Sequence, residues 1–121
     1  MTFVHKPDDG TLVEKYGMKL NVFPAFSDQV SFAQGSIEVG HLEEFSHAES
    51  WFVYFITSGH GTFVINDEHH PAEAGDIVAV PPDHRIHYFG KMEYLLVTSP
   101  SWSEEAETHI RMIDPDESPY S

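Results

Sequence analysis

Histidine is the residue type in this chain with the widest chemical range. Nine histidines stand among 121 residues, and there is no cysteine. A thiolate nucleophile, a disulfide framework and sulfur ligands are therefore excluded, so any metal site must use imidazole and carboxylate groups. An imidazole can also act as a general acid or base near neutral pH. The histidines are the first candidates for a site, and the strands that position them come next.

Acidic residues dominate the charge of the chain. Twenty Asp and Glu residues against six Lys and Arg give a formal net charge of −14. Six basic residues cannot build the clustered positive surface that nucleic acid or an anionic membrane requires, so we expect neither as a partner. The chain start lacks an apolar run after a basic segment, and nowhere do about eighteen apolar residues follow one another. A cytoplasmic protein is expected.

Short alternating runs rich in Val, Ile, Phe, Tyr and Thr indicate about eight strands. They are expected at residues 11–16, 18–23, 30–39, 51–57, 62–65, 76–80, 85–89 and 92–98. Many short strands separated by turn residues predict a sandwich or a barrel. Helical character occurs only at 101–113, where Ser103 is a possible N-cap. The barrel domain is expected to span 1–113, and the acidic, proline-containing residues 114–121 to form a solvated tail.

Glycines and prolines between residues 40 and 90 carry a family signature. Gly75, Asp76 and the Pro81–Pro82 pair fall in register with the second motif of the cupin superfamily, and residues 52–59 have the frame that ends its first motif. The chain therefore resembles a small, single-domain, RmlC-like cupin. The resemblance implies an all-β fold, namely one antiparallel jelly-roll barrel, or double-stranded β-helix. Cupins of this kind are commonly homodimers, and strand 11–16 is available for pairing with a second copy.

The same resemblance identifies four positions at which metal-binding cupins place their ligands. In this sequence they carry Phe45, His47, Phe52 and Ile86. Three of these side chains have no lone pair to donate, so we favour the absence of a tightly bound metal. One inserted residue after Pro82 would instead turn His87 inward. His47 and His87 would then be candidate ligands for zinc, nickel or iron.

Strand alternation extends the predicted lining of the barrel. If Phe52 and Ile86 point inward, so do Tyr54 and Tyr88, while His84 lies near the mouth. An apolar, aromatic pocket with a few polar groups is typical of a site for a small organic ligand. The candidate catalytic residues are His47, Tyr54 and Tyr88, and the candidate ligand contacts are Phe45, Phe52, Ile86 and His84. His47 has an equally good interpretation as a hydrogen-bonded structural histidine.

Three functions remain open at this stage. The first is a small cupin that binds an organic ligand in its barrel, as a metal-free isomerase or cyclase. The second is a metal-dependent enzyme of the oxygenase, isomerase or lyase type that uses His47 and His87, together with nonstandard ligands such as His41, Glu43, Glu44 or His84. The third is a non-catalytic ligand-binding or partner module.

Overall fold

Two long strands organise the fold. In the computed structural model, which describes residues 2–121, β5 (Trp51–Ile65) pairs antiparallel with β8 (Ile86–Ser99) along its whole length. One bulge between Ile56 and Ser58 interrupts their register. The sequence predicts each of these as two separate strands, because glycines stand in the middle of both. Those glycines bring the strands close together, and a Cβ at Gly59 would lie 2.2 Å from the carbonyl oxygen of Lys91.

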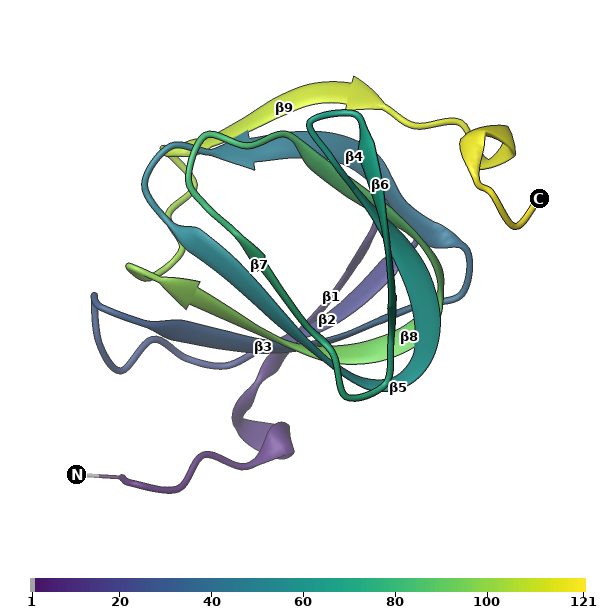
Figure 1. Ribbon diagram of the computed structural model, residues 1–121. Helices are drawn as coiled ribbons and strands as arrows, with labels where there is room; N and C mark the ends of the chain where they lie inside the picture. The colour runs from purple at the N-terminus through teal and green to yellow at the C-terminus, as the bar shows by residue number, and fades with distance from the viewer. Residues whose placement is uncertain (1) are drawn as a thin grey trace.

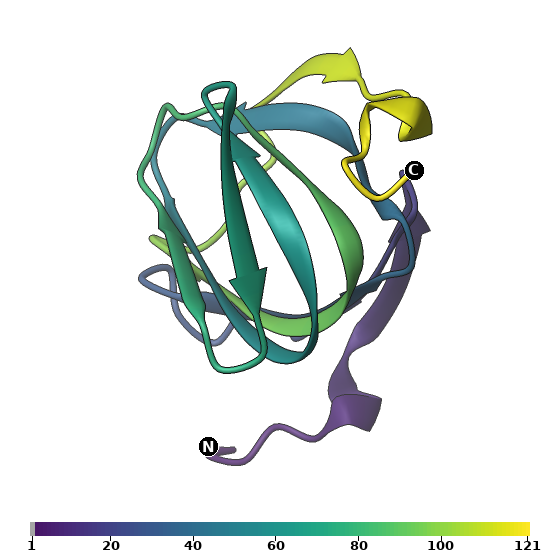
Figure 2. The same ribbon diagram turned by 45° about the vertical axis from the view of Figure 1, so that its right-hand side comes forward.

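The remaining strands complete a curled antiparallel sheet. Its order is β1-β2-β3-β8-β4-β9, while β5 pairs with β6, β7 and β8. The bounds are β1 (Thr11–Lys15), β2 (Met18–Val22), β3 (Ser31–Ile37), β4 (Gly40–His47), β6 (Glu68–Glu73), β7 (Ile77–Val80) and β9 (Glu107–Met112). Figures 1 and 2 show the sheet wrapped around one interior, which confirms the jelly-roll barrel. Among residues 2–121 no helix is long and apolar enough to cross a membrane.

The core lies inside this wrap. Strand alternation turns Ile86 and Tyr88 inward, and the bulge after Ile56 shifts the alternation in β5 so that both Ile56 and Phe63 point inward. Each of these four residues is at least 98% buried. A smaller apolar cluster of Val64, Phe89 and Ile113 lies on the outer face. Successive residues of β8 therefore alternate between the core inside the barrel and the cluster on its outer face. This division separates the candidate site from a second set of buried polar groups.

Residues 101–113 do not form the helix that the sequence suggests. Residues 107–112 form β9, which pairs with the edge of β4 in the register Phe45 to His109 and His47 to Glu107. An uncovered edge of β4 would leave a row of backbone donors and acceptors without partners, and the β-branched Thr108 and Ile110 suit a strand. Tertiary pairing thus overrides the local helix signals around Ser103.

The two ends of the chain lie outside the barrel (Figure 1). Most of residues 114–121 are exposed, but they contain a short 3-10 turn (Pro115–Glu117), and the hydroxyl of Tyr120 hydrogen-bonds that of Thr62 at 2.8 Å. At the other end, another 3-10 turn (Pro7–Asp9) precedes β1, which pairs only with β2. The free edge of β1 carries an exposed Leu12. Dimer formation through this strand stays a prediction, which light scattering at micromolar concentration would test.

Candidate functional site

A pocket of about 310 Å³ opens into the barrel interior. Its inner wall is aromatic and includes Phe45, Phe52, Tyr54 and Tyr88. Phe45 and Phe52 occupy two of the cupin ligand positions, and Tyr54 and Tyr88 are the residues that strand alternation adds to the predicted lining. Ile86 lies deeper in the core and does not line the pocket. The pocket has the volume and the mainly apolar surface of a site for a small organic molecule.

His41 is the imidazole of this pocket. Its ring stacks on Tyr88 with a centroid separation of 5.2 Å and meets the edge of Phe45. Nδ1 lies 2.9 Å from the backbone oxygen of Glu43, and since a carbonyl can only accept, Nδ1 carries the proton. Burial, and to a lesser degree the charge of Lys15, lowers the pKa of His41 to about 4. His41 is therefore neutral at pH 7, and its Nε2 has a free lone pair.

Glu43 is the second polar group on this wall. It also points into the pocket, and its Oε1 is 3.8 Å from Nε2 of His41. The other carboxylate oxygen, Oε2, accepts a hydrogen bond of 2.7 Å from Nδ1 of His109 on β9. His109 itself is half exposed. A buried carboxylate is thus fixed from the solvent side by one histidine and faces another inside the pocket.

Three tyrosines contact one another inside the barrel, and two of them, Tyr54 and Tyr88, line the pocket. The hydroxyl groups of Tyr88 and Tyr94 lie 2.5 Å apart, and the ring of Tyr54 contacts both rings edge-on. Burial raises the pKa of Tyr54 and of Tyr88 well above the usual value of 10. Both phenols therefore keep their protons and can act as hydrogen-bond donors.

The mouth of the pocket carries charge and one large aromatic ring. Lys15 comes from β1, Glu107 from β9, and Trp102 from the loop between β8 and β9. The indole Nε1 of Trp102 donates to Glu107 Oε1 at 3.0 Å. Basic, acidic and flat apolar groups are thus available to a ligand that has several polar edges.

The histidines favoured by the sequence lie elsewhere. His47 accepts from the backbone N–H of Ser50 at Nδ1 (3.0 Å) and lies 3.1 Å from the carbonyl of Ser103 at Nε2. Both ring nitrogens are engaged, and His47 does not line the pocket. His84 bonds the backbone oxygen of Pro82 and is likewise not part of the lining. His47 therefore has the contacts of its structural interpretation.

His47 and His87 are not brought together. No extra residue shifts the register after Pro82, so Ile86 and Tyr88 point inward and His87 points outward, edge-on to Phe89. At the four cupin ligand positions, only His47 has a donor atom, and the backbone occupies it. Within residues 2–121, no group of three or more His, Asp or Glu side chains has the arrangement of a metal site. The residues present do not fit the metal of the family.

A second buried polar cluster surrounds Glu44 on the outer face of β4. Its carboxylate lies 3.3 Å from Nη1 of Arg85, 3.4 Å from Nε of Arg111 and 3.6 Å from Nδ1 of His87. Glu44 is 1% exposed, and Nδ1 of His87 has no hydrogen-bond partner among the described residues. Arg111 also pairs with Glu117, so this cluster connects the barrel to β9 and the C-terminal turn.

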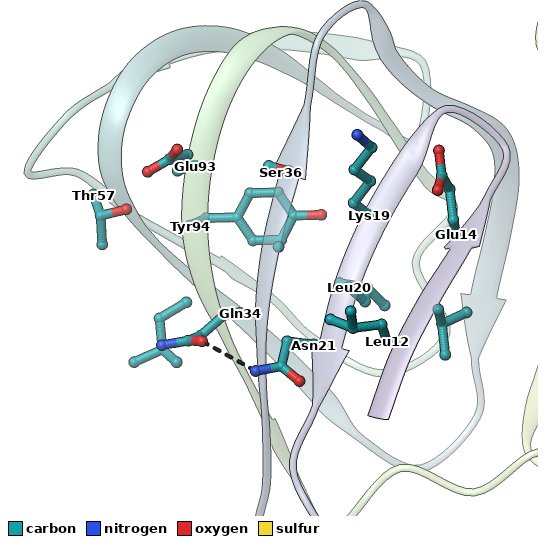
Figure 3. A pocket seen from close by; sticks show the side chains of 13 residues that line it. Leu12, Glu14, Lys19, Leu20, Asn21, Gln34, Ser36, Thr57, Glu93 and Tyr94 are labelled. Atoms are coloured by element: carbon teal, nitrogen blue, oxygen red, sulfur yellow. Dashed lines mark hydrogen bonds between the residues drawn. The ribbon is translucent and has the colours of Figure 1, made fainter. Parts of the chain in front are cut away.

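A larger hollow, of about 840 Å³, lies on the exposed side of β1, β2, β3 and β8. Figure 3 shows Lys19 and Glu14 at one side of it and the hydrogen-bonded Asn21 and Gln34 at another. It contains no histidine and none of the groups around His41. The smaller barrel pocket therefore holds the chemistry despite its size.

Comparison with known proteins agrees with this geometry. Residues 40–90 match the family model of the AraC-like ligand-binding domain. Over 99% of its length the chain is 37% identical to all of Pac13, described as "a unique nucleoside dehydratase", with a TM-score of 0.95. The chain belongs to the cupin superfamily. An RmlC-like cupin from Shewanella frigidimarina shares the fold at 14% identity, with a TM-score of 0.71 over 87% of this chain and 96% of the other. No curated protein sequence matches.

Variants of the Pac13 protein were also solved with uridine. One Streptomyces variant carries glutamine in place of a histidine. It is 36% identical to this chain, with a TM-score of 0.96, and the match covers 99% of this chain and 100% of that variant. Two others carry phenylalanine in place of a tyrosine. This cupin therefore has relatives of nearly the same length whose structures contain a nucleoside.

Sequence reasoning missed the polar half of the pocket. His41 and Glu43 were considered only as donors at the barrel mouth, and His109 was not considered at all. The one available signal was the spacing of His41, Glu43 and Phe45, which places all three on one face of a strand. His109 and Glu107 reach the site from β9, a strand that local sequence did not predict.

Proposed function

We propose that this cupin is a nucleoside dehydratase that eliminates water from a uridine-type nucleoside inside its barrel. The observation that carries the proposal is a match of three residues. The histidine and the two tyrosines substituted in the uridine-containing Pac13 structures have the same order and the same spacing along the chain as His41, Tyr54 and Tyr88. All three line the barrel pocket. This elimination is a lyase reaction, so the proposal replaces the isomerase or cyclase activity that the sequence favours.

The pocket supplies the groups that an elimination needs. A C–H bond breaks, its electron pair forms a carbon–carbon double bond, and the neighbouring C–O bond breaks. Neutral His41, with its free Nε2, takes the proton and can return it to the departing hydroxide, which leaves as water. A sugar C–H is acidic enough for an imidazole only beside a carbonyl group, so the proposed substrate carries a carbonyl on its sugar.

The tyrosines can stabilise the negative charge that develops during the elimination. Deprotonation beside a carbonyl puts negative charge on the carbonyl oxygen, and preorganised donors in a site that excludes water stabilise such an oxygen. Tyr54 and Tyr88 retain their protons because burial raises the pKa of each phenol. The ammonium group of Lys15 at the mouth adds positive charge on the same pocket. No metal enters this scheme.

The test is turnover followed by mass spectrometry. The wild-type protein is incubated with uridine and with uridine derivatives that carry a carbonyl on the sugar. We expect a product lighter by one water from a carbonyl derivative and none from uridine itself. His41→Gln should lower the rate by about a hundredfold or more, because general-base catalysis contributes on that order. The control is His69→Gln, which changes an exposed histidine of β6.

Two results would count against the proposal. One is the absence of dehydrated product from every nucleoside of the set. The other is a His41→Gln variant that dehydrates the substrate as fast as wild type, which would mean that another residue is the general base.

A further inference from the structure

Two hydrogen-bond acceptors face the pocket from the same strand. Nε2 of His41 and Oε1 of Glu43 lie 3.8 Å apart, too far for a hydrogen bond between them. Neither atom accepts a hydrogen bond from any residue that the structure describes. Both side chains are nevertheless more than nine-tenths buried. Both atoms belong to side chains that line the pocket, and neither is sealed off from it, so they are available to donors that a ligand brings.

The carboxylate is held in place from outside. His109 donates to Oε2 of Glu43 at 2.7 Å, and β9 places this histidine opposite Phe45 in the β4 register. One oxygen of Glu43 is therefore committed to the protein, and the other, Oε1, remains directed toward the pocket. This geometry differs from that of a solvated surface carboxylate, whose two oxygens are both free to rotate.

We infer that Glu43 is the specificity-determining residue that recognises a ribose hydroxyl, and that His109 is its positioning residue. The inference rests on the proposed function. The hydroxyl donates to Oε1 of Glu43, which sets the neighbouring carbon of the sugar against Nε2 of His41. Because 3.8 Å separates the two acceptors, they can contact adjacent atoms of one sugar ring at the same time. The chemical class recognised is a ribonucleoside, in preference to a deoxyribonucleoside.

The experiment measures binding, so that it does not depend on turnover. Uridine, 2′-deoxyuridine and 3′-deoxyuridine are titrated into the full-length protein by calorimetry. Loss of a hydrogen bond to a buried charged group weakens binding by about tenfold or more. We therefore expect at least one deoxy analogue to bind the wild type about tenfold more weakly than uridine does.

Variants then assign the discrimination to Glu43. The ratio to follow is the dissociation constant of the weaker-binding deoxy analogue divided by that of uridine. Glu43→Gln should reduce this ratio toward one. His109→Ala should reduce it in part, and His109→Gln, which can still donate to the carboxylate, should restore some of it. Glu44→Gln is the matched control, since it makes the same chemical change one residue along the strand on the opposite face. It should lower thermal stability and leave the ratio unchanged.

The outcomes separate the two proposals. If uridine and both deoxy analogues bind the wild type equally, or if Glu43→Gln keeps the full discrimination, the inference about Glu43 is wrong while nucleoside binding stands. If no nucleoside binds at all, the proposed function fails and the inference fails with it. If Glu44→Gln changes the ratio as much as Glu43→Gln, the effect is a general disturbance of β4 and the assignment is overturned.

Discussion

Glu43 and Glu44 are neighbours on β4, and both are buried, yet their surroundings differ completely. Glu44, on the outer face, lies within 3.6 Å of two arginines and a histidine. Glu43, on the inner face, has one hydrogen bond and an oxygen left over for the pocket. Removing one partner of such a buried ionic cluster is destabilising, so Glu44 has a structural role. The free oxygen of Glu43 is open to the pocket, where a ligand can donate to it.

The histidines of the two faces show the same contrast. His41 inside the barrel has its tautomer fixed by a backbone carbonyl, so that its free nitrogen faces the pocket. His87 outside the barrel packs against Phe89 beside the Glu44 carboxylate. The inner face of β4 is thus the chemical face, and the outer face fastens β9 and the C-terminal turn to the barrel.

The largest expected effect is on the dehydration rate, and it distinguishes His41 from His87. His41→Gln should lower the dehydration rate by about a hundredfold or more. His87→Gln should leave the rate within about twofold of wild type, because His87 does not reach the pocket. Initial rates and melting temperatures are measured together for both variants. Equal rate losses in the two variants would remove the distinction between the faces.

The next effect concerns stability at acid pH. Burial lowers the pKa of His41 from 6.5 to about 4, so between these values the unfolded chain binds more protons than the folded protein. Stability is therefore full above about pH 6.5 and falls as the pH drops toward 4, by up to about 3 kcal/mol from this residue. Urea unfolding of wild type and His41→Gln at pH 7 and pH 4.5 measures this loss in the free energy of unfolding.

His87 adds to this acid effect in the same direction, because burial also lowers its pKa. His41→Gln should therefore reduce the pH dependence without removing it. A His41→Gln variant with the full wild-type pH dependence would show that His41 is not protonated in this range on unfolding.

A smaller effect is expected from the outer carboxylate. Glu44→Gln weakens its contacts with Arg85 and Arg111 and should lower the free energy of unfolding by about 1–3 kcal/mol. Both arginines are partly exposed and keep their other partners, Asp67 and Glu117, which limits the loss. Thermal melting measures the change. Unaltered stability would mean that the outer cluster does not fasten β9.

The smallest effect lies at the edge of the outer cluster. The pair of Arg111 and Glu117 is roughly half exposed on both sides, and such pairs contribute less than about 1 kcal/mol. Glu117→Gln should therefore lower the melting temperature only slightly, and high salt should abolish even that difference. A loss as large as that of Glu44→Gln would show that the C-terminal turn is part of the core network.

The sequence predicted the barrel and the apolar half of its pocket for a clear physical reason. Alternation along a strand fixes which side chains share a face, so the sequence alone places Phe52 and Tyr54 on the same face. The glycines and prolines between residues 40 and 90 carry the resemblance to cupins, and that resemblance predicted the jelly-roll barrel. These are local signals, and they require no knowledge of distant contacts.

The polar half escaped prediction because its signals are not local. In β4, both Glu43, which points inward, and Glu44, which points outward, are polar and buried, so hydropathy does not alternate there. His109 enters the site only because β9 covers the edge of β4, and residues 101–113 have helix signals of their own. His47 occupied a family ligand position, but the backbone of the loops around it satisfies both of its nitrogens.

The most direct measurement follows the histidine rings by NMR while uridine is added. We predict that the ring resonances of His41 and His109 shift with the same saturation curve, while those of His87 stay in place. This result would locate the nucleoside against the inner face of β4. Shifts at His87 with His41 unchanged would contradict the account, because they would place the ligand on the outer face, which we assign to structure.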